Sequence, residues 1–490
     1  MKTILHNFRI VDETTDMRGT VVLEDGLITE VLPWDEDFPG NVLNDRRIDY
    51  GRREAGLFIN GRGFPGSANT DSFPLLVPAF VDLHAHFRES GGPAESPPAG
   101  GGIFSESGHP SEAVPPSETG PLSETLESGC LAAVAGGYGT VVCMANTRPP
   151  VDTVEKAARL RERADRLGLI DLYPVLSLTK NMEGKELSGI AGLEDRPGAA
   201  VYFPPMLSED GRDLADDGLL LAAMEEARRL GLPVSCHCDF GGPEEAAARA
   251  AGRPRRVWSR IGENNAVRRI IALGKEAGCH IHIAHVSTKE AADLIREAKA
   301  AAVPPFTLTC EATPHHIALT EADAAAMGPE SHGRVNPPLR EDADRRAIIE
   351  AIRDGTIDAI ATDHAPHRAA DKAAGAPGFT GLETAFGVCC RELVRPGILS
   401  LSRLSALMSA NPARIVHGGT SALRGAPDRG RIAPGFRADL AVIDGEAEWT
   451  MESAAFRSRG RNSPFIGQTI QGRILITIHQ GRIVFDVQHG

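Results

Sequence analysis

Short apolar runs alternate with amphipathic stretches through the middle of the chain. Apolar residues recur at intervals of three and four in four of these stretches, which predicts helices over 154–168, 217–231, 263–278 and 288–301. Runs of β-type residues lie before, between and after them, at 75–84, 139–146, 171–178, 198–203, 232–237, 280–285, 306–311 and 357–364. Eight such runs with intervening helices predict an α/β protein built on a (β/α)8 barrel.

The two ends of the chain show a different pattern. TILHNFRIVD and GTVVLEDGLITEVL near the start, and ADLAVIDG, GRILITIHQG and GRIVFD near the end, look like strands joined by turns. We expect these ends to pair as a small β-sandwich domain. The predicted boundaries are 1–75 for its N-terminal part, 76–415 for the barrel and 416–490 for its C-terminal part.

Three segments carry little periodic pattern. Residues 36–72 are charged and Gly-rich, which indicates an insertion. Residues 90–123 are low-complexity Gly, Pro, Ser and Glu, too polar to form a core, and we predict a flexible insertion in the barrel. The Gly- and Ala-rich stretch 364–380 is expected to move when a ligand binds.

Charge and composition narrow the class of protein. The net charge of −14 over 490 residues argues against a general nucleic-acid binder and favours a cytoplasmic protein. The N-terminal sequence does not resemble a signal peptide, and no apolar run reaches the length of a membrane span. The eight cysteines have no regular spacing, so we expect reduced thiols, including Cys236 and Cys238.

Polar residues fall where the predicted strands end. They are His84 and His86 on the first run and then Asn146, Asp210, His237, His285, Glu311 and Asp363 on later ones. A single histidine at a strand end is more often structural, but the carboxyl ends of barrel strands converge on one face, so these residues should share one pocket. His84 and His86 lie two residues apart and therefore face the same side of a strand. Imidazole and carboxylate groups together suit Zn²⁺, and four histidines with two aspartates would hold two ions if one carboxylate bridged them.

Several motifs together are more specific than any one of them. They are HAHFRE, CMANTRPPVD, SEDG, PVSCHCD, IAHVST, CEATPHH, RVNPPLR, IATDHAPH, GLET and RGRNSPFIGQTIQGRI. With these motifs the chain resembles the bacterial class I dihydroorotases of the amidohydrolase superfamily. The resemblance runs from about residue 77 to the C-terminus and is interrupted by residues 90–123.

The resemblance implies a role for individual residues. The implied metal ligands, for one or two Zn²⁺ ions, are His84, His86, Asp210, His237, His285 and Asp363. The implied substrate-binding residues are Arg88, Asn146, Asn336 and His367, with backbone groups at Pro377 and Gly378. Asp363 would also carry the proton during catalysis, and Glu209 is the alternative to Asp210 as the bridging ligand.

The implied activity is the reversible cyclisation of N-carbamoyl-L-aspartate to (S)-dihydroorotate in de novo pyrimidine biosynthesis. The partner is then a small molecule, and the family suggests a homodimer and an association with aspartate carbamoyltransferase. The chain departs from the family pattern at Ser90 and Ala145, and the stretch before GLET, near Gly378, is one residue short.

Two alternatives remain open. Dihydropyrimidinases, hydantoinases and allantoinases usually bridge their metals with a carboxylated lysine, and GAAVYFPPMLSEDG contains none. Arg88 and His367 also favour a substrate with a free carboxylate, which dihydropyrimidines lack. A non-catalytic subunit of an aspartate carbamoyltransferase complex would have lost metal ligands, whereas every ligand position is filled here.

Overall fold

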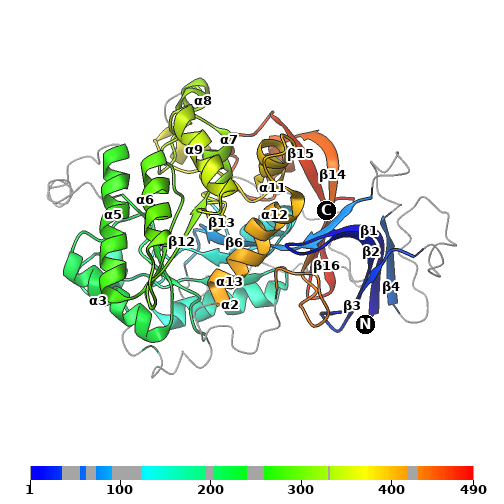
Figure 1. Cartoon of the computed structure of the whole chain (residues 1–490), viewed down its shortest axis with the longest axis horizontal. Helices are drawn as coiled ribbons and strands as arrows, with labels where there is room; N and C mark the ends of the chain where they lie inside the picture. The colour runs from blue at the N-terminus through cyan, green and yellow to red at the C-terminus, as the bar shows by residue number, and fades with distance from the viewer. Residues whose placement is uncertain are drawn as a thin grey trace.

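Three sheets and the helices around them make up the protein. The computed structural model describes residues 2–35, 56–61, 73–90, 123–190, 193, 202–239, 259–328, 332–417 and 429–488. Figure 1 shows the helices gathered around the parallel strands on one side and a large mixed sheet on the other. The predicted flexible insertion falls outside the described residues except for its first and last positions.

The mixed sheet has eight strands and contains both ends of the chain. Its members are β1 (Lys2–Val11), β2 (Asp16–Glu24), β3 (Leu27–Pro33), β4 (Gly56–Asn60), β5 (Leu75–Pro78), β14 (Leu440–Thr450), β15 (Thr469–His479) and β16 (Arg482–Asp486). The order is β16-β15-β14-β5-β1-β2-β3, with β4 paired to β1. β14 runs antiparallel to β5, so the C-terminal strands complete a sheet begun at the N-terminus (Figure 1). The weakly patterned segment 36–72 thus contains a strand, β4, that its sequence did not predict.

Eight further strands are all parallel. β6 (Phe80–Ala85), β7 (Tyr138–Cys143) and β8 (Asp171–Pro174) form one sheet, and β9 (Leu207–Ser208), β10 (Val234–Cys236), β11 (His280–Ile283), β12 (Thr307–Ala312) and β13 (Ala359–Ile360) form another. Parallel bridges from Leu176 to Leu207 and from Ala85 to His364 connect the two sheets at both edges. Within the described residues the strands therefore follow one another in a closed ring.

The apolar run 75–84 belongs to two sheets. Its first part is β5 of the mixed sheet, and its second part is β6 of the parallel ring. The change occurs at Ala79, whose N–H donates to Asp439 O, while the next N–H, of Phe80, donates to Gly137 O. The fourth run is also placed differently, because the described part of 198–203 is not a strand and β9 lies at Leu207–Ser208 instead.

The four predicted helices form at nearly the expected positions, as α2 (Val154–Leu167), α3 (Asp217–Leu230), α5 (Arg260–Ala277) and α6 (Lys289–Ala300). A Ser, Thr or Asp side chain caps the N-terminus of each one. The helices α2, α3 and α5 end at a glycine with positive φ, which a side chain would strain.

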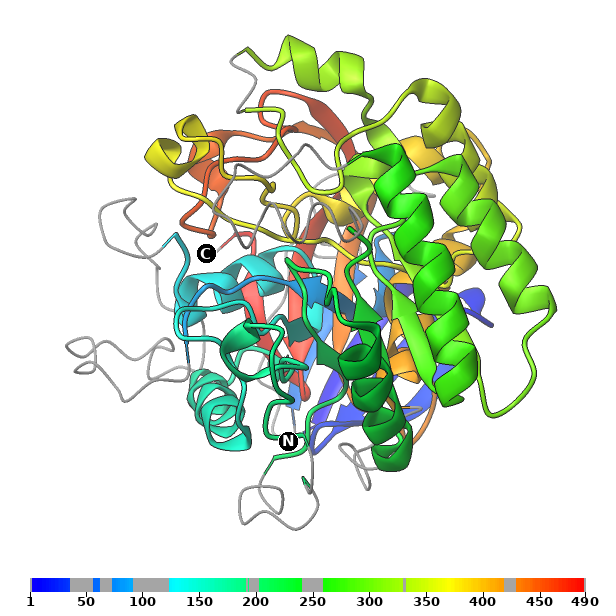
Figure 2. The same cartoon turned by 90° about the vertical axis from the view of Figure 1, so that its left-hand side faces the viewer.

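Further helices connect the later strands, and α1 precedes β7. They are α1 (Leu126–Ala135), α7 (Pro314–Ala318), α8 (Glu321–Ala326), α9 (Asp342–Arg353), α10 (Ala369–Ala373), α11 (Ala385–Cys389), α12 (Leu401–Ser405) and α13 (Asn411–His417). Figure 2 shows the long helices α5 and α6 lying side by side on the outside of the strands. In the described part of the chain, no helix is long and apolar enough to cross a membrane.

Candidate metal centre

The six predicted metal ligands come together at the carboxyl ends of the parallel strands. His84 is in β6, and His86, Asp210, His237, His285 and Asp363 follow the ends of β6, β9, β10, β11 and β13. All six are buried, with exposed fractions between 0% and 8%. His285 and Asp363 have positive φ values of 34° and 47°, a conformation that costs energy in non-glycine residues. The fold thus holds strained backbone where these side chains converge.

Two overlapping groups of side chains present ligand atoms to a common point. One consists of His84, His86 and Asp363, and the other of His84, Asp210 and His285. The Nε2 atom of His86 is 3.0 Å from Asp363 Oδ1, and that of His84 is 3.3 Å from Asp210 Oδ1. Two atoms each about 2.0 Å from a tetrahedral cation are about 3.3 Å apart. These separations therefore fit ligands of one or two divalent ions.

His237 joins the second group. Its Nδ1 atom lies 3.0 Å from Asp210 Oδ1 and 3.1 Å from His285 Nε2. Two ring nitrogens this close need a proton or a cation between them, because two lone pairs facing each other would repel. All six predicted ligands are thus brought together.

Glu311 orients His84. The carboxylate of Glu311, in β12, accepts a hydrogen bond from His84 Nδ1 at 2.8 Å and another from His282 Nε2 at 3.0 Å. With Nδ1 protonated, Nε2 of His84 carries the lone pair and faces the two aspartates. This Nε2 atom is buried and forms no hydrogen bond of regular geometry within the described residues. A carboxylate behind a histidine is the usual support of a metal ligand.

The electrostatics of the cluster also favour a cation. Burial raises the pKa of Asp210 and Asp363, but the surrounding histidines outweigh it and hold both values well below the usual range. Burial lowers the pKa of His84, yet Asp210 and Glu311 raise it overall. Burial likewise raises the pKa of Glu311, and hydrogen bonds from His282 and His84 bring it down to about 2. The carboxylates are therefore ionised, and a divalent cation can replace the protons that balance them.

The structure distinguishes Asp210 from its neighbour Glu209. Asp210 lies within the cluster, where its Oδ2 atom also accepts a hydrogen bond from Asn146 Nδ2 at 3.2 Å. Glu209 points elsewhere and accepts hydrogen bonds from the backbone N–H and hydroxyl of Thr179. Asp210 is therefore the carboxylate that faces the histidines.

Arg88 is a half-buried cation beside this cluster. Its φ is 59°, and its Nε atom is buried with no hydrogen-bond partner in the part of the chain that the structure describes. Burial lowers its pKa, while Asp363 and Asp210 counteract this. The neighbouring Glu89 pairs instead with Arg163 and accepts the N–H of Leu126 at 2.6 Å. Arg88 is thus available to an anionic ligand.

The remaining predicted substrate residues lie on nearby loops. Asn146 accepts a hydrogen bond from His86 Nδ1 at 2.8 Å, so it supports the metal cluster directly. His367 Nε2 lies 2.8 Å from Pro377 O and 3.4 Å from Arg88 Nη2. Donation to the carbonyl leaves this nitrogen no lone pair, so it does not accept from Arg88. Burial and the charge of Arg88 lower the pKa of His367 to about 3, so the ring is neutral.

Asn336 and His315 come from two further segments near this loop. Asn336 is half-buried. The next residue, Pro337, accepts a hydrogen bond from His316 Nε2 at 3.0 Å. His315 is buried, and its ring lies 5.4 Å from that of Phe379. His316 therefore supports the loop that carries Asn336.

Some residues at the site had no clear signal in the sequence. Asp82 accepts the N–H and hydroxyl of Thr362 at 2.9 and 2.5 Å and so connects β6 to the segment after β13. Burial raises its pKa to about 7. Asp358, which precedes β13, pairs with Lys299 and accepts the N–H of Cys310, away from the cluster. The sequence predicted which type of residue lies at the end of each run, but not which residue it contacts.

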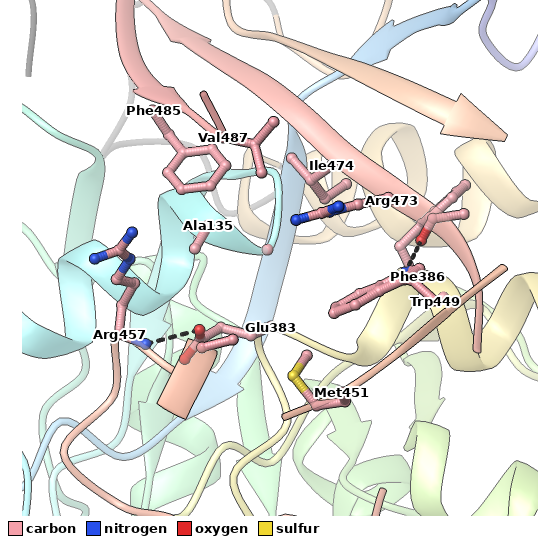
Figure 3. Close-up of a pocket in the computed structure, with 14 residues that line it drawn as sticks. Ala135, Glu383, Phe386, Trp449, Met451, Arg457, Arg473, Ile474, Phe485 and Val487 are labelled. Atoms are coloured by element: carbon pink, nitrogen blue, oxygen red, sulfur yellow. Dashed lines mark hydrogen bonds between the residues drawn. The ribbon is translucent and has the colours of Figure 1, made fainter. Parts of the chain in front are cut away.

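Two cavities lie away from the cluster, and none of the predicted site residues lines either of them. One, of about 190 Å³, lies between the segment 383–387 and the C-terminal strands, with Trp449, Arg457 and Arg473 around it. Figure 3 shows the carboxylate of Glu383 in this cavity accepting a hydrogen bond from the backbone of Arg457, at 2.8 Å. The other, of about 800 Å³, is lined by charged residues of both signs, among them Arg161, Asp171 and Arg482.

Comparison with known proteins points to the same family as the sequence motifs. Residues 75–484 match the model of the amidohydrolase family. A dihydroorotase of Clostridium botulinum is 34% identical over 485 residues, which cover 99% of this chain and 100% of the relative. A dihydroorotase of Anaeromyxobacter dehalogenans is 36% identical over 490 residues, which cover 98% of this chain and 96% of the relative.

Solved structures share the fold at lower sequence identity. An L-hydantoinase (dihydropyrimidinase) from Arthrobacter aurescens superposes with a TM-score of 0.74 and is 21% identical, with coverage of 99% of this chain and 96% of that one. A dihydropyrimidinase from Brevibacillus agri has a TM-score of 0.73 at 18% identity, with coverage of 99% and 95%. At these identities the likeness concerns the fold alone.

Proposed function

Since the chain belongs to the amidohydrolase family, and within it to the dihydroorotases, we propose that it interconverts N-carbamoyl-L-aspartate and (S)-dihydroorotate. The observation that carries this proposal is Arg88, a half-buried guanidinium at the edge of the cluster whose buried Nε atom has no hydrogen-bond partner among the described residues. A planar fork of N–H donors suits the free carboxylate that this substrate bears. A neutral ring amide without a carboxylate would leave that charge buried and unsatisfied.

Zn²⁺ is the cation that the donor set fits best. His84, His86, Asp210, His237, His285 and Asp363 would hold one or two ions, with Asp210 as the bridging ligand. When bound, the metal supplies a water molecule of lowered pKa and polarises the carbonyl that is attacked. Asn146 and Glu311 keep His86 and His84 in the tautomers that leave their Nε2 atoms free for the ion.

Asp363 carries the proton. Its carboxylate is ionised in the buried cluster and lies 3.0 Å from His86 Nε2. In hydrolysis, water adds to the ring carbonyl carbon, and Asp363 takes the proton that the water loses. The bond from that carbon to the ring nitrogen then breaks, and Asp363 returns the proton to the departing nitrogen. In the biosynthetic direction the ureido nitrogen attacks the side-chain carboxylate, and water leaves.

The other substrate residues position the ring. Arg88 binds the carboxylate, and Asn336 and the neutral His367 surround it. Pro377 and Gly378 offer backbone groups from the loop that follows β13. Together these residues favour an acidic cyclic amide over dihydropyrimidines, and the absence of a lysine between 202 and 211 agrees with an aspartate as bridging ligand.

The same proposal extends to the architecture. The ring of parallel strands and its helices, from β6 to residue 415, is the (β/α)8 barrel that carries the active site. The mixed sheet belongs to a β-sandwich domain formed by the two ends of the chain. Its N-terminal part extends to Pro78, because β5 (Leu75–Pro78) crosses the boundary predicted at residue 75.

One assay separates the candidate functions. Purified protein is incubated with dihydroorotate, dihydrouracil or allantoin, with and without a chelator, and with zinc restored. We expect chelator-sensitive hydrolysis of dihydroorotate alone. Turnover of dihydrouracil without dihydroorotate would overturn the proposal in favour of a dihydropyrimidinase, and no turnover of any substrate by zinc-loaded protein would indicate a non-catalytic subunit. Full activity in Asp363→Asn would contradict the role of Asp363.

A further inference from the structure

The carbonyl of Gly378 receives two side-chain donors from different parts of the chain. Lys372 Nζ lies 2.9 Å from this oxygen, and Asn462 Nδ2 lies 3.0 Å from it. Lys372 is in α10, within the loop that follows β13, whereas Asn462 comes from the segment between β14 and β15. Two donors from distant parts of the chain therefore fix the position of this carbonyl.

Lys372 is a buried lysine whose amine uses all three donors when it is protonated. Burial, with the charge of Arg334, lowers its pKa to about 7. Lys372 is 5% exposed, and its ammonium also donates to Arg334 O at 2.6 Å and to Ala376 O at 3.2 Å. Three carbonyl acceptors match the three N–H groups of a protonated amine. The charge also lies 4.9 Å from the centre of the Phe379 ring. Burying a lysine costs free energy, and these hydrogen bonds and the ring contact offset that cost.

Both polar atoms of the Asn462 side chain form hydrogen bonds with the loop that follows β13. Its Oδ1 atom accepts the backbone N–H of His367 at 2.9 Å, and its Nδ2 atom also donates to Ala365 O at 3.0 Å. One side chain therefore fixes the backbone on both sides of Pro366 as well as at Gly378. Through Asn462 the C-terminal segment reaches the residues beside Asp363.

Further hydrogen bonds hold the loop that Lys372 and Asn462 contact. Gly378 N donates to Arg334 O at 3.0 Å, and His367 Nε2 donates to Pro377 O at 2.8 Å. Gly378 has a φ of 129°, and an added Cβ atom would lie 2.5 Å from Ala365 Cβ. Any residue with a side chain would clash at this position, so the close approach of this backbone to Ala365 and His367 requires glycine.

We propose that Lys372 and Asn462 form a clamp on the Gly378 carbonyl that sets the positions of His367, Pro377 and Gly378 for substrate binding. Neither side chain touches the substrate in this proposal, so both are positioning residues. The inference rests on the proposed function for the identity of the substrate. It predicts that loss of the clamp weakens substrate binding and leaves the metal ligands in place, because no ligand contacts either side chain among the interactions of the described residues.

The experiment is a double-mutant cycle of Lys372→Met, Asn462→Ala and both together. Lys185→Met and Asn265→Ala, at exposed positions, are the matched controls. We measure KM and kcat with dihydroorotate and bound zinc per chain. Each single variant should raise KM about tenfold with kcat changed less than about threefold and zinc content unchanged. Because both side chains act on one carbonyl, the double variant should raise KM by clearly less than the product of the single effects.

Asn462→Asp tests the donor separately. It keeps an acceptor for the His367 N–H but places a carboxylate oxygen against the carbonyls of Ala365 and Gly378. We expect it to raise KM at least as much as Asn462→Ala. A wild-type KM in this variant would overturn the proposal, as would single-variant effects that simply multiply or that reduce zinc content in parallel.

A second readout needs no turnover. Amide hydrogen exchange should show faster exchange at Ala365, His367 and Gly378 in Lys372→Met and Asn462→Ala, while α5 and α6 keep their wild-type protection. Faster exchange spread evenly over the chain would indicate loss of stability and contradict the clamp. If the wild-type protein does not convert dihydroorotate, the proposed function fails, and exchange still decides whether the clamp exists.

Discussion

The two ring nitrogens of His84 face different partners. Nδ1 is directed to Glu311, which also holds His282, while Nε2 faces the carboxylates of Asp210 and Asp363. A proton fixed on Nδ1 makes Nε2 the stronger ligand atom, because its lone pair cannot be lost to tautomerism. The affinity of the metal centre therefore depends on a residue that never touches the ion.

Replacing Glu311 by Gln is expected to weaken metal binding by about 10- to 100-fold, as the loss of such a supporting group typically does. The measurement is a competition titration with a chelator of known affinity. Asp358→Asn is the matched control, because Asp358 pairs with Lys299 and, among the described residues, no hydrogen bond or ion pair joins it to a predicted ligand. Equal affinities in the Gln variant and the wild type would contradict the support role of Glu311.

Arg88 gives a prediction on the substrate side. Arg88→Gln removes the charge that would bind the substrate carboxylate, a hydrogen bond to a charged group that contributes about 1.5–3 kcal/mol. We expect kcat/KM for dihydroorotate to fall by about 10- to 150-fold, with zinc content unchanged. Arg166→Gln, at an exposed position on α2, is the control. A loss of zinc in the Arg88 variant would show that the effect is not on the substrate.

The residues at the ends of apolar runs could be predicted, and their partners could not. His84, His237, His285 and Asp363 follow from strand periodicity and the convergence of strand ends. The pairing of Glu311 with His84, and of Lys372 with the Gly378 carbonyl, depends on strand order and loop path, which no local pattern encodes. A single lysine in an Ala- and Gly-rich loop resembles any solvated lysine until its three carbonyl partners are known.

At the level of elements, the end of β6 is tied to two helices. Glu89 accepts the N–H of Leu126 at the N-terminus of α1 and pairs with Arg163 of α2. A carboxylate at this end of a helix is favourable because it satisfies an N–H that lacks an intrahelical partner and faces the positive end of the helix dipole. Although they are adjacent in sequence, Arg88 and Glu89 therefore interact with different parts of the molecule.

The change Glu89→Ala should reduce the free energy of unfolding by about 1–3 kcal/mol, because the N–H of the buried Leu126 and the half-buried Arg163 each lose a partner. Chemical denaturation measures it, with Glu162→Ala, an exposed residue paired with Arg166, as the control. The KM for dihydroorotate should change little. A variant as stable as the control would show that the contact with Leu126 contributes nothing.

Helices were easier to predict than strands for a physical reason. The helices α2, α3, α5 and α6 carry their own signals, since caps and periodicity lie within each segment. β9 has only two residues and β4 lies in a charged segment, so their existence depends on neighbouring strands. The run 75–84 is divided between two sheets by hydrogen bonds to Asp439 and Gly137, which are far away in the sequence.

Over the whole molecule, the half-buried Glu383 and the buried Glu124 join the C-terminal segment to the part of the chain that carries the parallel strands. Glu383 accepts the backbone N–H groups of Arg457 and Ser458 at 2.8 and 3.0 Å, and Glu124 accepts the N–H of Arg459 at 3.1 Å. Burial raises the pKa of Glu383 to about 7, and Glu124 adds repulsion. This contact continues along the chain to Asn462.

The raised pKa makes stability depend on pH. Between the unfolded pKa of about 4.3 and the folded value of about 7, the folded state binds a proton that the unfolded state lacks. The free energy of unfolding therefore falls as pH rises through this window, by at most about 1.4 kcal/mol per pH unit. Glu383→Gln should flatten that slope in denaturation curves at pH 5, 6 and 7. The exposed Glu452→Gln serves as control, and parallel slopes in both variants would refute the assignment.

The position of β5 has a consequence for the protein while it is being made. β5 is paired on one side with β1, which is synthesised before it, and on the other with β14, which begins at Leu440. At about 5–20 residues per second, the ribosome needs roughly 20–70 s to reach that strand. During this time the backbone groups on the edge of β5 that later pairs with β14 lack a partner and can pair with a strand of another chain. The nascent chain should thus depend on chaperones most strongly before residue 440 leaves the ribosome.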